Sequence, residues 1–477
     1  MASLLDLEDP SLLVSLNFIG SDWKTGASDR TFSVTDPASL RPIGVHQESD
    51  DSDVLKAIEA AEVALHTWKA QSGRQRSRIL RRWFDLVIEN KNDLARLISV
   101  ENGKAQADAA AEVSLASTYL EWLAEEAARI YGDVAPHSNP SCRISILKEP
   151  VGVCGLIIPW NFPAAMVTRK LAPCLAAGCT AVLKPDGLTP YTASALVLLA
   201  QRAGVPAGVI NIVNALDNTS AVGRILCENP TVRKISFTGS TRVGQISLQQ
   251  SAKNIQKLSL ELGGNAPFIV LDDADLEVAA SSLIACKFKV WGQTCVCANR
   301  VVKELVAGFK VGPASDVTTT QGPLIHSRVV AKREEHVRDA VSKGAEVLIG
   351  GGSLAEKGPN YFQPTVLINA NADMRIAQEE TFGPIAAIFK FSTDSEAIAA
   401  ANNTDMGLAS YMMTNDMNRA RKVSEALQAG MVVINTGAIA DAAAPFGGVK
   451  YSGLGRESSK YGIEEYLSLK TIVTGNC

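Results

Sequence analysis

The sequence lacks a strong excess of charge of either sign and any long apolar segment. Lys and Arg total 46 against 50 acidic residues, and a net charge of −4 offers no basic surface to nucleic acid or an anionic membrane. Even the densest basic stretch, residues 74–82, has apolar residues at helical spacing, which predicts arginines on the solvated face of a helix. No apolar run approaches the ~20 residues that span a bilayer, and the N-terminus has no basic leader. These absences predict a cytoplasmic protein that binds neither nucleic acid nor a membrane.

Histidine is scarce, and the cysteines are scattered. The five histidines show no HxxxH spacing, and the CxC pair of Cys295 and Cys297 has no second pair nearby, so no metal site is expected. Nine cysteines, an odd number without regular spacing, are typical of reduced thiols and not of a disulfide framework. No GxGxxG follows an expected strand, and FTGSTRVG lacks the pattern of an NTPase phosphate loop.

Short β-rich runs alternate with helical segments over most of the chain. From about 151 to 261 this alternation predicts βαβ units and a doubly wound parallel sheet with helices on both faces, and a second α/β alternation follows after 264. The segments SCRISILKEP and EEYLSLKTIV read as exposed strands suited to bridging domains or pairing with another chain. The expected boundaries are 1–130 and 151–261 for the first domain, 262–445 for the second, and 131–150 and 463–477 for the exposed strands.

Cys295 is a candidate nucleophile. The small and polar residues at 292–294 predict a turn or a helix start, where backbone N–H groups favour a thiolate. Asn161 in PWNFP is a candidate oxyanion donor, and Glu261, a lone carboxylate in an apolar run, is a candidate general base. Two simpler interpretations stay open: Cys295 as a small buried apolar residue, and Glu261 as the ion-pair partner of a strand end.

Seven short motifs occur along the chain in the order PWNFP (159–163), LKP (183–185), FTGSTRVG (237–244), ELGGNAPFIV (261–270), GQTCVCANR (292–300), EETFGP (379–384) and PFGGVKYSGLGRE (445–457). Together they resemble the aldehyde dehydrogenase superfamily, and most closely its succinate-semialdehyde dehydrogenase branch. The resemblance implies an α/β fold with a doubly wound cofactor domain, a second α/β catalytic domain and a small β oligomerisation flap. It also implies NAD(P)-dependent oxidation of an aldehyde to the acid through a cysteine thiohemiacetal and thioester, in a homodimer or homotetramer.

The family's site residues carry over by position. Cys295 is then the nucleophile, Glu261 the base, and Asn161 the oxyanion donor together with the Cys295 backbone N–H. Lys170 assists near that oxyanion site. The implied contacts of the NAD or NADP cofactor are Ile157, Pro159, Trp160, Lys184 at the adenosine ribose, Gly187, Gly239 and Ser240 beneath the pyrophosphate, Leu262, and Glu380 and Phe382 at the nicotinamide ribose.

The substrate positions depart from the semialdehyde branch. Where that branch holds the substrate carboxylate with two arginines and a serine, this chain keeps Arg169 but has Lys289 and Ala440, so succinate semialdehyde is expected to bind weakly. Trp291 favours an aromatic or extended apolar aldehyde, unless it only packs. Gly187 stands where NAD-preferring members often carry a glutamate, so NADP is expected to be accepted.

Between Arg300 and Gly322 the chain barely fits the strand, helix and turn of the family, which predicts a shortened segment at 301–321. The leading interpretation is an active NAD(P)-dependent aldehyde dehydrogenase. The alternative is a truncated, catalytically weak homologue with a structural or partner-binding role. Cys297 is either a bystander or the partner of Cys295 in a redox switch that inactivates the enzyme on oxidation.

Overall fold

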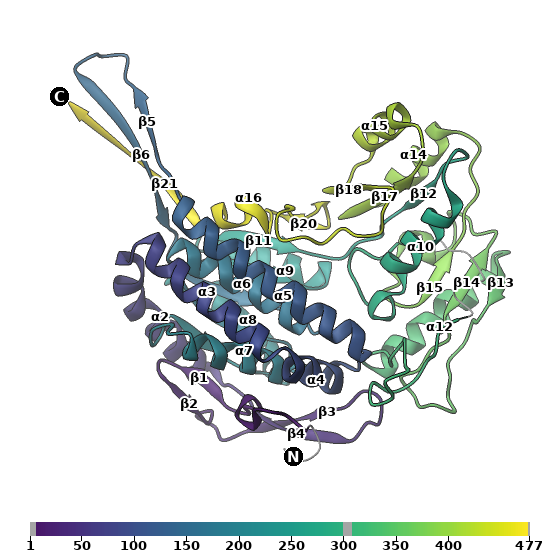
Figure 1. The fold of residues 1–477 in the computed structure, drawn as a ribbon, viewed down its shortest axis with the longest axis horizontal. Helices are drawn as coiled ribbons and strands as arrows, with labels where there is room; N and C mark the ends of the chain where they lie inside the picture. Colours follow the sequence, from purple (N-terminus) through teal and green to yellow (C-terminus); the bar gives the residue numbers. More distant parts are fainter. Residues whose placement is uncertain (1–5, 299–307, 476–477) are drawn as a thin grey trace.

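An eight-stranded sheet forms the largest layer of the structure (Figure 1). The structure is a computed structural model, and it describes residues 6–298 and 308–475. The five central strands, β9, β8, β7, β10 and β11, are parallel. Because β8 and β9 lie on one side of β7, and β10 and β11 on the other, the sheet is doubly wound, as predicted, with its switch point between β7 and β10. In sheet order the strands are β2 (Asp22–Lys24), β1 (Asn17–Ile19), β9 (Ile210–Ile212), β8 (Thr180–Lys184), β7 (Val153–Ile157), β10 (Val232–Thr238), β11 (Lys257–Glu261) and β20 (Gly453–Leu454).

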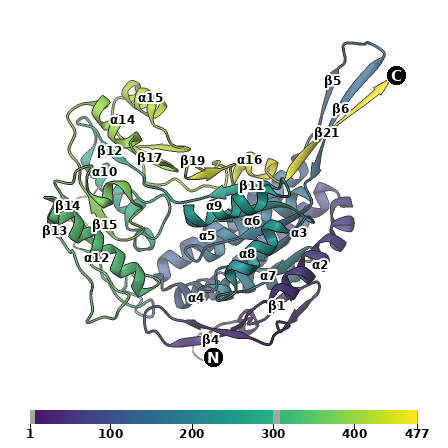
Figure 2. The same cartoon turned by 180° about the vertical axis from the view of Figure 1, so that it is seen from behind.

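Helices cover both faces of this sheet (Figures 1 and 2). On one face α2 (Asp51–Ala70) packs against α8 (Thr219–Glu228), and α9 (Thr241–Ala252) lies beside α8. On the other face α6 is buried along its whole length among its neighbours, as its mostly small and apolar sequence favours. The helices of this face are α3 (Gly73–Glu89), α4 (Lys91–Asn102), α5 (Gln106–Glu126), α6 (Pro163–Ala177) and α7 (Pro190–Arg202).

The basic helix α3 differs from expectation at one arginine. Arg76 is only 7% exposed, and its Nε donates to the Ala176 carbonyl at 2.9 Å. Because the last carbonyls of a helix have no partner within it, this arginine satisfies the C-terminal end of α6. The prediction that all these arginines lie on a solvated face is therefore wrong for Arg76.

Two three-stranded sheets build a second α/β part, and their inner faces share one apolar core. The sheets are β12 (Phe268–Val270), β17 (Ala409–Met413) and β18 (Met431–Ile434), all parallel, and β13 (Glu346–Ile349), β14 (Thr365–Ile368) and β15 (Ile385–Ala387). The helices around them are α10 (Leu276–Lys287), α12 (Ser327–Ser342), α13 (Arg375–Gln378), α14 (Asp394–Asn402) and α15 (Met417–Ala426).

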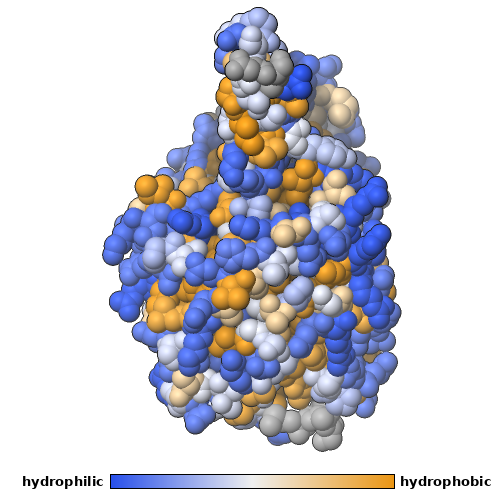
Figure 3. Space-filling view, turned by 90° about the vertical axis from the view of Figure 1, so that its left-hand side faces the viewer, coloured by the Kyte–Doolittle hydropathy of each residue, from blue (hydrophilic) through white to orange (hydrophobic). Residues whose placement is uncertain are grey.

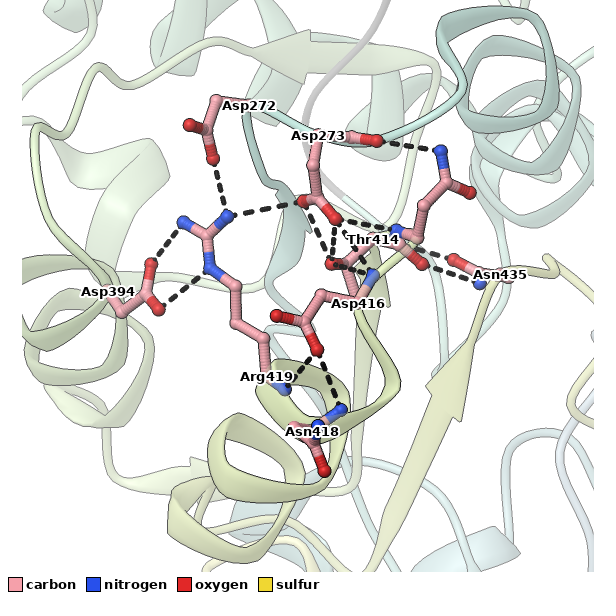
Figure 4. A network of polar contacts seen from close by, with 9 residues as sticks. Asp272, Asp273, Asp394, Thr414, Asp416, Asn418, Arg419 and Asn435 are labelled. Atoms are coloured by element: carbon pink, nitrogen blue, oxygen red, sulfur yellow. Dashed lines mark hydrogen bonds and ion pairs between the residues drawn. The ribbon is translucent and has the colours of Figure 1, made fainter.

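A polar network fixes the carboxyl edge of the parallel three-stranded sheet (Figure 4). Arg419 of α15 bonds the carboxylates of Asp272 at 2.5 Å, Asp273 at 3.2 Å and Asp394 at 2.5 Å. Asp273 also accepts the Thr414 hydroxyl at 2.7 Å. Since these residues follow β12 and β17 and begin α14, the network holds two strand ends and two helices together.

Three antiparallel strands form an arm that projects from the body (Figure 1). They are β5 (Asp133–Pro136), β6 (Cys142–Pro150) and β21 (Leu467–Gly475), and β21 pairs with β6 along its whole length. Val134, Leu469 and Val473 are 72%, 71% and 56% exposed on this arm. Figure 3 shows apolar side chains gathered where the arm meets the body. The two predicted exposed strands are confirmed, and they pair with each other.

The remaining elements are short, and the segment predicted to be shortened lies partly outside the described residues. Its described part, 308–321, forms turns and one bridge between Val311 and Gln321.

In the described part of the chain, no helix has the length and apolar character needed to cross a bilayer. The remaining elements are β3 (Thr31–Thr35), β4 (Pro42–Gln47), β16 (Met406–Gly407), β19 (Val449–Lys450), α16 (Ser459–Glu464), and the 3-10 turns η1 (Pro10–Leu12), η2 (Ala127–Arg129) and η3 (Lys289–Gly292). The domain boundaries stay a prediction.

Candidate active site

A cavity of about 470 Å³ lies between α5, α6, α10 and the loop that carries Cys295. Cys295, Arg169, Lys289 and Ala440 all line it, so the fold brings together four of the predicted site residues from distant parts of the chain. A mostly apolar pocket with a few polar groups suits a small organic molecule. The apolar walls include Phe162, Phe288, Phe309, Ile439 and Phe446.

Cys295 lies in a turn, where the Cys297 N–H donates to the Thr294 carbonyl at 3.0 Å. The predicted turn is confirmed, but no helix starts here, since α10 ends at Lys287. Burial raises the pKa of the Cys295 thiol to about 12, although the nearby Arg169 charge opposes the rise. Burial thus favours the neutral thiol, which needs a proton acceptor in order to react.

Asn161 is buried in the loop after β7. Its Nδ2 donates to the Gln293 carbonyl at 3.1 Å, and the Gln293 side-chain oxygen accepts from the Ile325 N–H at 3.0 Å. The Oδ1 atom of Asn161 has no hydrogen-bond partner among the described residues. One amide hydrogen thus fixes the side chain beside the loop of Cys295, and the second is left to donate to a ligand.

Glu261 is the last residue of β11 and is 2% exposed. Neither carboxylate oxygen has a hydrogen-bond partner in the described part of the protein, and Glu261 forms no ion pair there. Burial, reinforced by the nearby Glu457 charge, raises the pKa of this carboxyl well above its ordinary value. The ion-pair interpretation is therefore wrong, and the group has the raised pKa of a candidate proton acceptor.

A buried ion cluster lies beside this carboxyl. Glu457 forms an ion pair with the Lys170 ammonium and another with the Arg169 Nε at 2.7 Å, and Lys170 also donates to the Ser236 hydroxyl at 3.0 Å. Burial opposes ionisation of Glu457, but the Lys170 and Arg169 charges lower its pKa to about 2. Lys170 does not line the cavity, and Glu457 connects it to the lining residue Arg169.

Sequence reasoning missed Glu457, although it lies within the last quoted motif. The available signal was the pair of adjacent basic residues, Arg169 and Lys170, inside an otherwise apolar helix. Two buried cations require an anionic partner, because an unpaired charge is costly in the protein interior.

Two loops with expected cofactor contacts face each other. The Trp160 ring, in the loop that follows Ile157 and Pro159, meets the Phe382 ring edge to face, with centroids 5.8 Å apart. Glu380 accepts from the Gly264 N–H at 3.1 Å, and burial raises the pKa of its carboxyl to about 7. The loops of the two α/β parts thus meet at one place.

The α12 helix holds the second of these loops. Lys332 donates to the Glu380 carbonyl at 3.2 Å, and the buried Arg333 donates to the Phe382 carbonyl. Phe382 has a φ of +48°, a conformation that residues with a side chain rarely adopt. The contacts from α12 therefore support a strained loop.

The expected adenosine-ribose site lies where β8 ends. Lys184 is the last residue of β8, and burial lowers the pKa of its ammonium, while Asp186 opposes this change. A Cβ on Gly187 would lie 2.8 Å from the Leu216 Cβ, so no side chain fits there without movement. The backbone is left free to approach a ligand closely.

The expected pyrophosphate site lies at the N-terminus of α9. Ser240 is the N-cap residue and accepts from the Val243 N–H at 3.5 Å, and Gly239 precedes it. Leu262 is buried in the apolar core beneath this region. Together these sites offer hydrogen-bond donors and acceptors that fit a dinucleotide. They are the N-terminus of α9, the buried ammonium of Lys184 and the carboxylate of Glu380.

The model of the aldehyde dehydrogenase family matches residues 23–472. The chain belongs to this family. It is an NAD(P)-dependent oxidoreductase that acts on aldehyde groups, as the motifs predicted.

The chain is similar to named enzymes and to solved structures. The chain is 50% identical to succinate-semialdehyde dehydrogenase (NADP+) 1 of Schizosaccharomyces pombe, over 98% of this chain and 96% of that protein. It is also 50% identical to glutarate-semialdehyde dehydrogenase of Pseudomonas putida, over 98% and 99%. The crystal structure of an NADP dependent enzyme from Escherichia coli matches with a TM-score of 0.97 at 47% identity, over 98% and 100%. Because the chain spans nearly the whole length of each, the alternative of a truncated homologue is wrong.

Trp291 does not line the cavity of this aldehyde dehydrogenase. It is 1% exposed and packs behind Phe288 and Phe309, with ring centroids 6.3 Å and 6.1 Å away. The structure thus shows Trp291 packed in the core, and the hypothesis that it favours an aromatic or extended apolar aldehyde stays a prediction. Lys289, in contrast, is exposed and forms no ion pair with the described residues, so its ammonium is free to meet an anion at the cavity mouth.

Cys297 is buried behind the cavity of the enzyme. Its thiol donates to the Lys287 carbonyl at 3.5 Å, and burial raises the pKa of this thiol. Both Cys295 and Cys297 are free thiols. Among the described residues no group of three or more His, Cys, Asp or Glu side chains is placed to hold a metal ion.

Proposed function

We propose that this aldehyde dehydrogenase oxidises a semialdehyde with a terminal carboxylate to the dicarboxylic acid. The observation that carries the proposal is that Cys295, Arg169 and Lys289 line one cavity. The names of two relatives at 50% identity, for succinate and glutarate semialdehyde, support the same class. Because Lys289 offers a point charge and Ala440 no hydrogen bond, we expect weaker carboxylate binding than two arginines and a serine would give.

The first step is addition of the Cys295 sulfur to the aldehyde carbon. The thiol proton passes to water, the sulfur forms a bond to the carbon, and the carbonyl electron pair moves onto the oxygen. The free amide hydrogen of Asn161 and the backbone N–H of Cys295 stabilise this oxyanion.

The second half of the reaction releases the acid. When bound, NAD(P)+ would supply the hydride acceptor, and loss of hydride from the tetrahedral adduct would leave a thioester on Cys295. Ionised Glu261 takes a proton from water, whose oxygen attacks the thioester carbon and displaces the Cys295 sulfur. The raised pKa of Glu261 makes it a stronger base than an exposed carboxylate.

The residues that would hold the cofactor are those of the expected ribose and pyrophosphate sites. Lys184 would meet the adenosine ribose, the α9 N-terminus with Gly239 and Ser240 the pyrophosphate, and Glu380 and Phe382 the nicotinamide ribose. Because Gly187 provides no carboxylate to repel a 2′-phosphate, we propose that NADP is accepted.

We also propose that the chain forms a homodimer or homotetramer through its arm and works in the cytoplasm. Exposed apolar residues on the arm, Val134, Leu469 and Val473, support this assembly, since such surface is usually covered. Light scattering of the purified protein tests the subunit number.

The deciding experiment measures NAD(P)H formation with succinate semialdehyde, glutarate semialdehyde, butyraldehyde and benzaldehyde, each with NAD and NADP. Turnover with the two semialdehydes at the highest kcat/KM supports the proposal. Turnover confined to butyraldehyde or benzaldehyde would contradict it and would mean that Lys289 and Ala440 no longer select a carboxylate.

A further inference from the structure

Asp108 lines the same cavity as Cys295, and nothing in the sequence motifs assigned it a role. It lies on α5, is half-buried, and accepts the Val290 N–H on its Oδ2 at 3.3 Å. Val290 directly follows Lys289 in the chain. The hydrogen bond therefore fixes the Asp108 carboxylate beside the segment that carries the ammonium of Lys289.

The charged side chains that line the cavity are not all paired with an opposite charge. Among the described lining residues the charged ones are Asp108, Arg169 and Lys289. Arg169 is already paired with Glu457 at 2.7 Å and stacks on the Phe446 ring at 4.3 Å. At the mouth, the Lys289 ammonium thus attracts a negatively charged aldehyde, and the Asp108 carboxylate repels it.

We propose that Asp108 is a specificity-determining residue that weakens the binding of anionic aldehydes in this cavity in proportion to the negative charge they carry. The Asp108 carboxylate repels each negative charge of the aldehyde, and this repulsion offsets part of the attraction by Lys289. An aldehyde with a doubly charged end is therefore penalised about twice as much as one with a single carboxylate. The inference rests on the proposed function in so far as Lys289 meets the substrate carboxylate.

The test compares three aldehydes of similar length: butyraldehyde without charge, succinate semialdehyde with one negative charge, and 3-phosphonopropanal with close to two in mildly alkaline buffer. Asp108→Asn removes the charge and keeps an oxygen that accepts the Val290 N–H, and Asp108→Ser is a second neutral variant. Glu121→Gln is the matched control, because Glu121 lies on the same helix, bonds Arg81 at 3.0 Å and does not line the cavity.

Asp108→Asn is expected to raise kcat/KM by about fivefold for each negative charge of the aldehyde, the order for two unit charges several ångströms apart at a protein surface. Butyraldehyde and the Glu121→Gln control are expected to stay unchanged. An equal change with all three aldehydes, no change, or the same trend in Glu121→Gln would overturn the inference.

The proposed function fails in a different way. In that case the unmodified enzyme oxidises butyraldehyde but neither anionic aldehyde. The inference is still decided, because turnover of the anionic aldehydes appears in Asp108→Asn if it is right and stays absent if it is wrong.

Discussion

The Asn161 side chain donates to the backbone carbonyl of Gln293 at 3.1 Å. Gln293 comes two residues before Cys295, so the bond ties the loop after β7 of the large sheet to the loop of the thiol. Since only one amide hydrogen is used, the contact orients the second one without consuming it. The position of the candidate oxyanion donor is thus set by the loop that carries the nucleophile.

Asn161→Ala is expected to slow turnover by roughly 100-fold or more, because one oxyanion donor contributes ~3 kcal/mol to the transition state. Steady-state NAD(P)H formation measures the loss. Thermal unfolding and alkylation of Cys295 by iodoacetamide serve as controls and should change little. An unchanged rate would remove Asn161 from the mechanism.

Glu261→Gln is expected to leave a burst of about one NAD(P)H per active site followed by slow turnover, because the thioester forms but its hydrolysis lacks a base. In the unmodified enzyme kcat should rise with pH, since the active form of Glu261 is ionised and its pKa lies above the ordinary range of a carboxyl. Stopped-flow kinetics and a pH profile measure both effects. A variant without a burst that keeps the normal pH profile would contradict the role of Glu261.

The same substitution should stabilise the fold. A carboxyl whose folded pKa is raised stabilises the folded state below its unfolded pKa, and that contribution is lost as pH rises towards the folded pKa. Glu261→Gln removes this loss, so its melting temperature should exceed that of the parent by a margin that grows with pH. Differential scanning calorimetry across neutral and alkaline pH measures the margin, and a constant or negative difference would contradict the raised pKa.

The motifs predicted that Asn161 and Glu261 lie at strand ends, and in the structure Asn161 follows β7 and Glu261 ends β11. They did not predict the place of Trp291, because Val290 and Trp291 adopt φ values of 51° and 55°, which no apolar periodicity reveals. Residues that reach the site from elsewhere in the chain were also missed, since their roles arise only from tertiary contacts. Glu457 and Asp108 are the examples.

Glu457→Gln is expected to destabilise the enzyme by about 3–5 kcal/mol, because it leaves the buried Lys170 and Arg169 without their anionic partner. Glu464→Gln is the matched control: Glu464 pairs with Lys148 at 2.8 Å but is 53% exposed, so a cost of about 0–1 kcal/mol is expected. Urea unfolding measures both. Similar costs in the two variants would mean that the cluster does not stabilise the fold.

Acid should weaken the same cluster. The pKa of Glu457 falls to about 2 in the folded protein from an ordinary value of 4.5, so its contribution is present above the unfolded pKa. We expect the stability difference between the parent and Glu457→Gln to shrink as pH falls from 4.5 towards about 2. Unfolding curves at several acidic pH values measure the difference, and a difference independent of pH would contradict the lowered pKa.

Cys297 is expected to make inactivation by peroxide reversible. Peroxide converts the Cys295 thiol to a sulfenic acid with release of water, and attack by the Cys297 sulfur expels a second water and forms a disulfide, which dithiothreitol reduces. The parent should therefore regain activity with dithiothreitol, whereas Cys297→Ala should recover less because its Cys295 is oxidised further. Equal recovery would identify Cys297 as a bystander.

Gly187→Glu tests whether the adenosine-ribose site can be converted to NAD preference by one substitution. The Cβ of the new side chain would lie 2.8 Å from the Leu216 Cβ and 2.9 Å from the Ala215 carbonyl oxygen, both closer than ordinary contacts. The loop after β8 must move to accept it, and Lys184 is the last residue of that strand. We therefore expect KM to rise for both NAD and NADP, whereas a site with room for the carboxylate would lose only NADP. Gly223→Glu is the matched control, because nothing lies within 4 Å of a Cβ there and its backbone has no left-handed conformation that a side chain would strain. Steady-state kinetics with each cofactor decide between the outcomes: a selective loss of NADP would show that the loop accommodates the glutamate, and parallel losses would show that the backbone at 187 must stay free of a side chain.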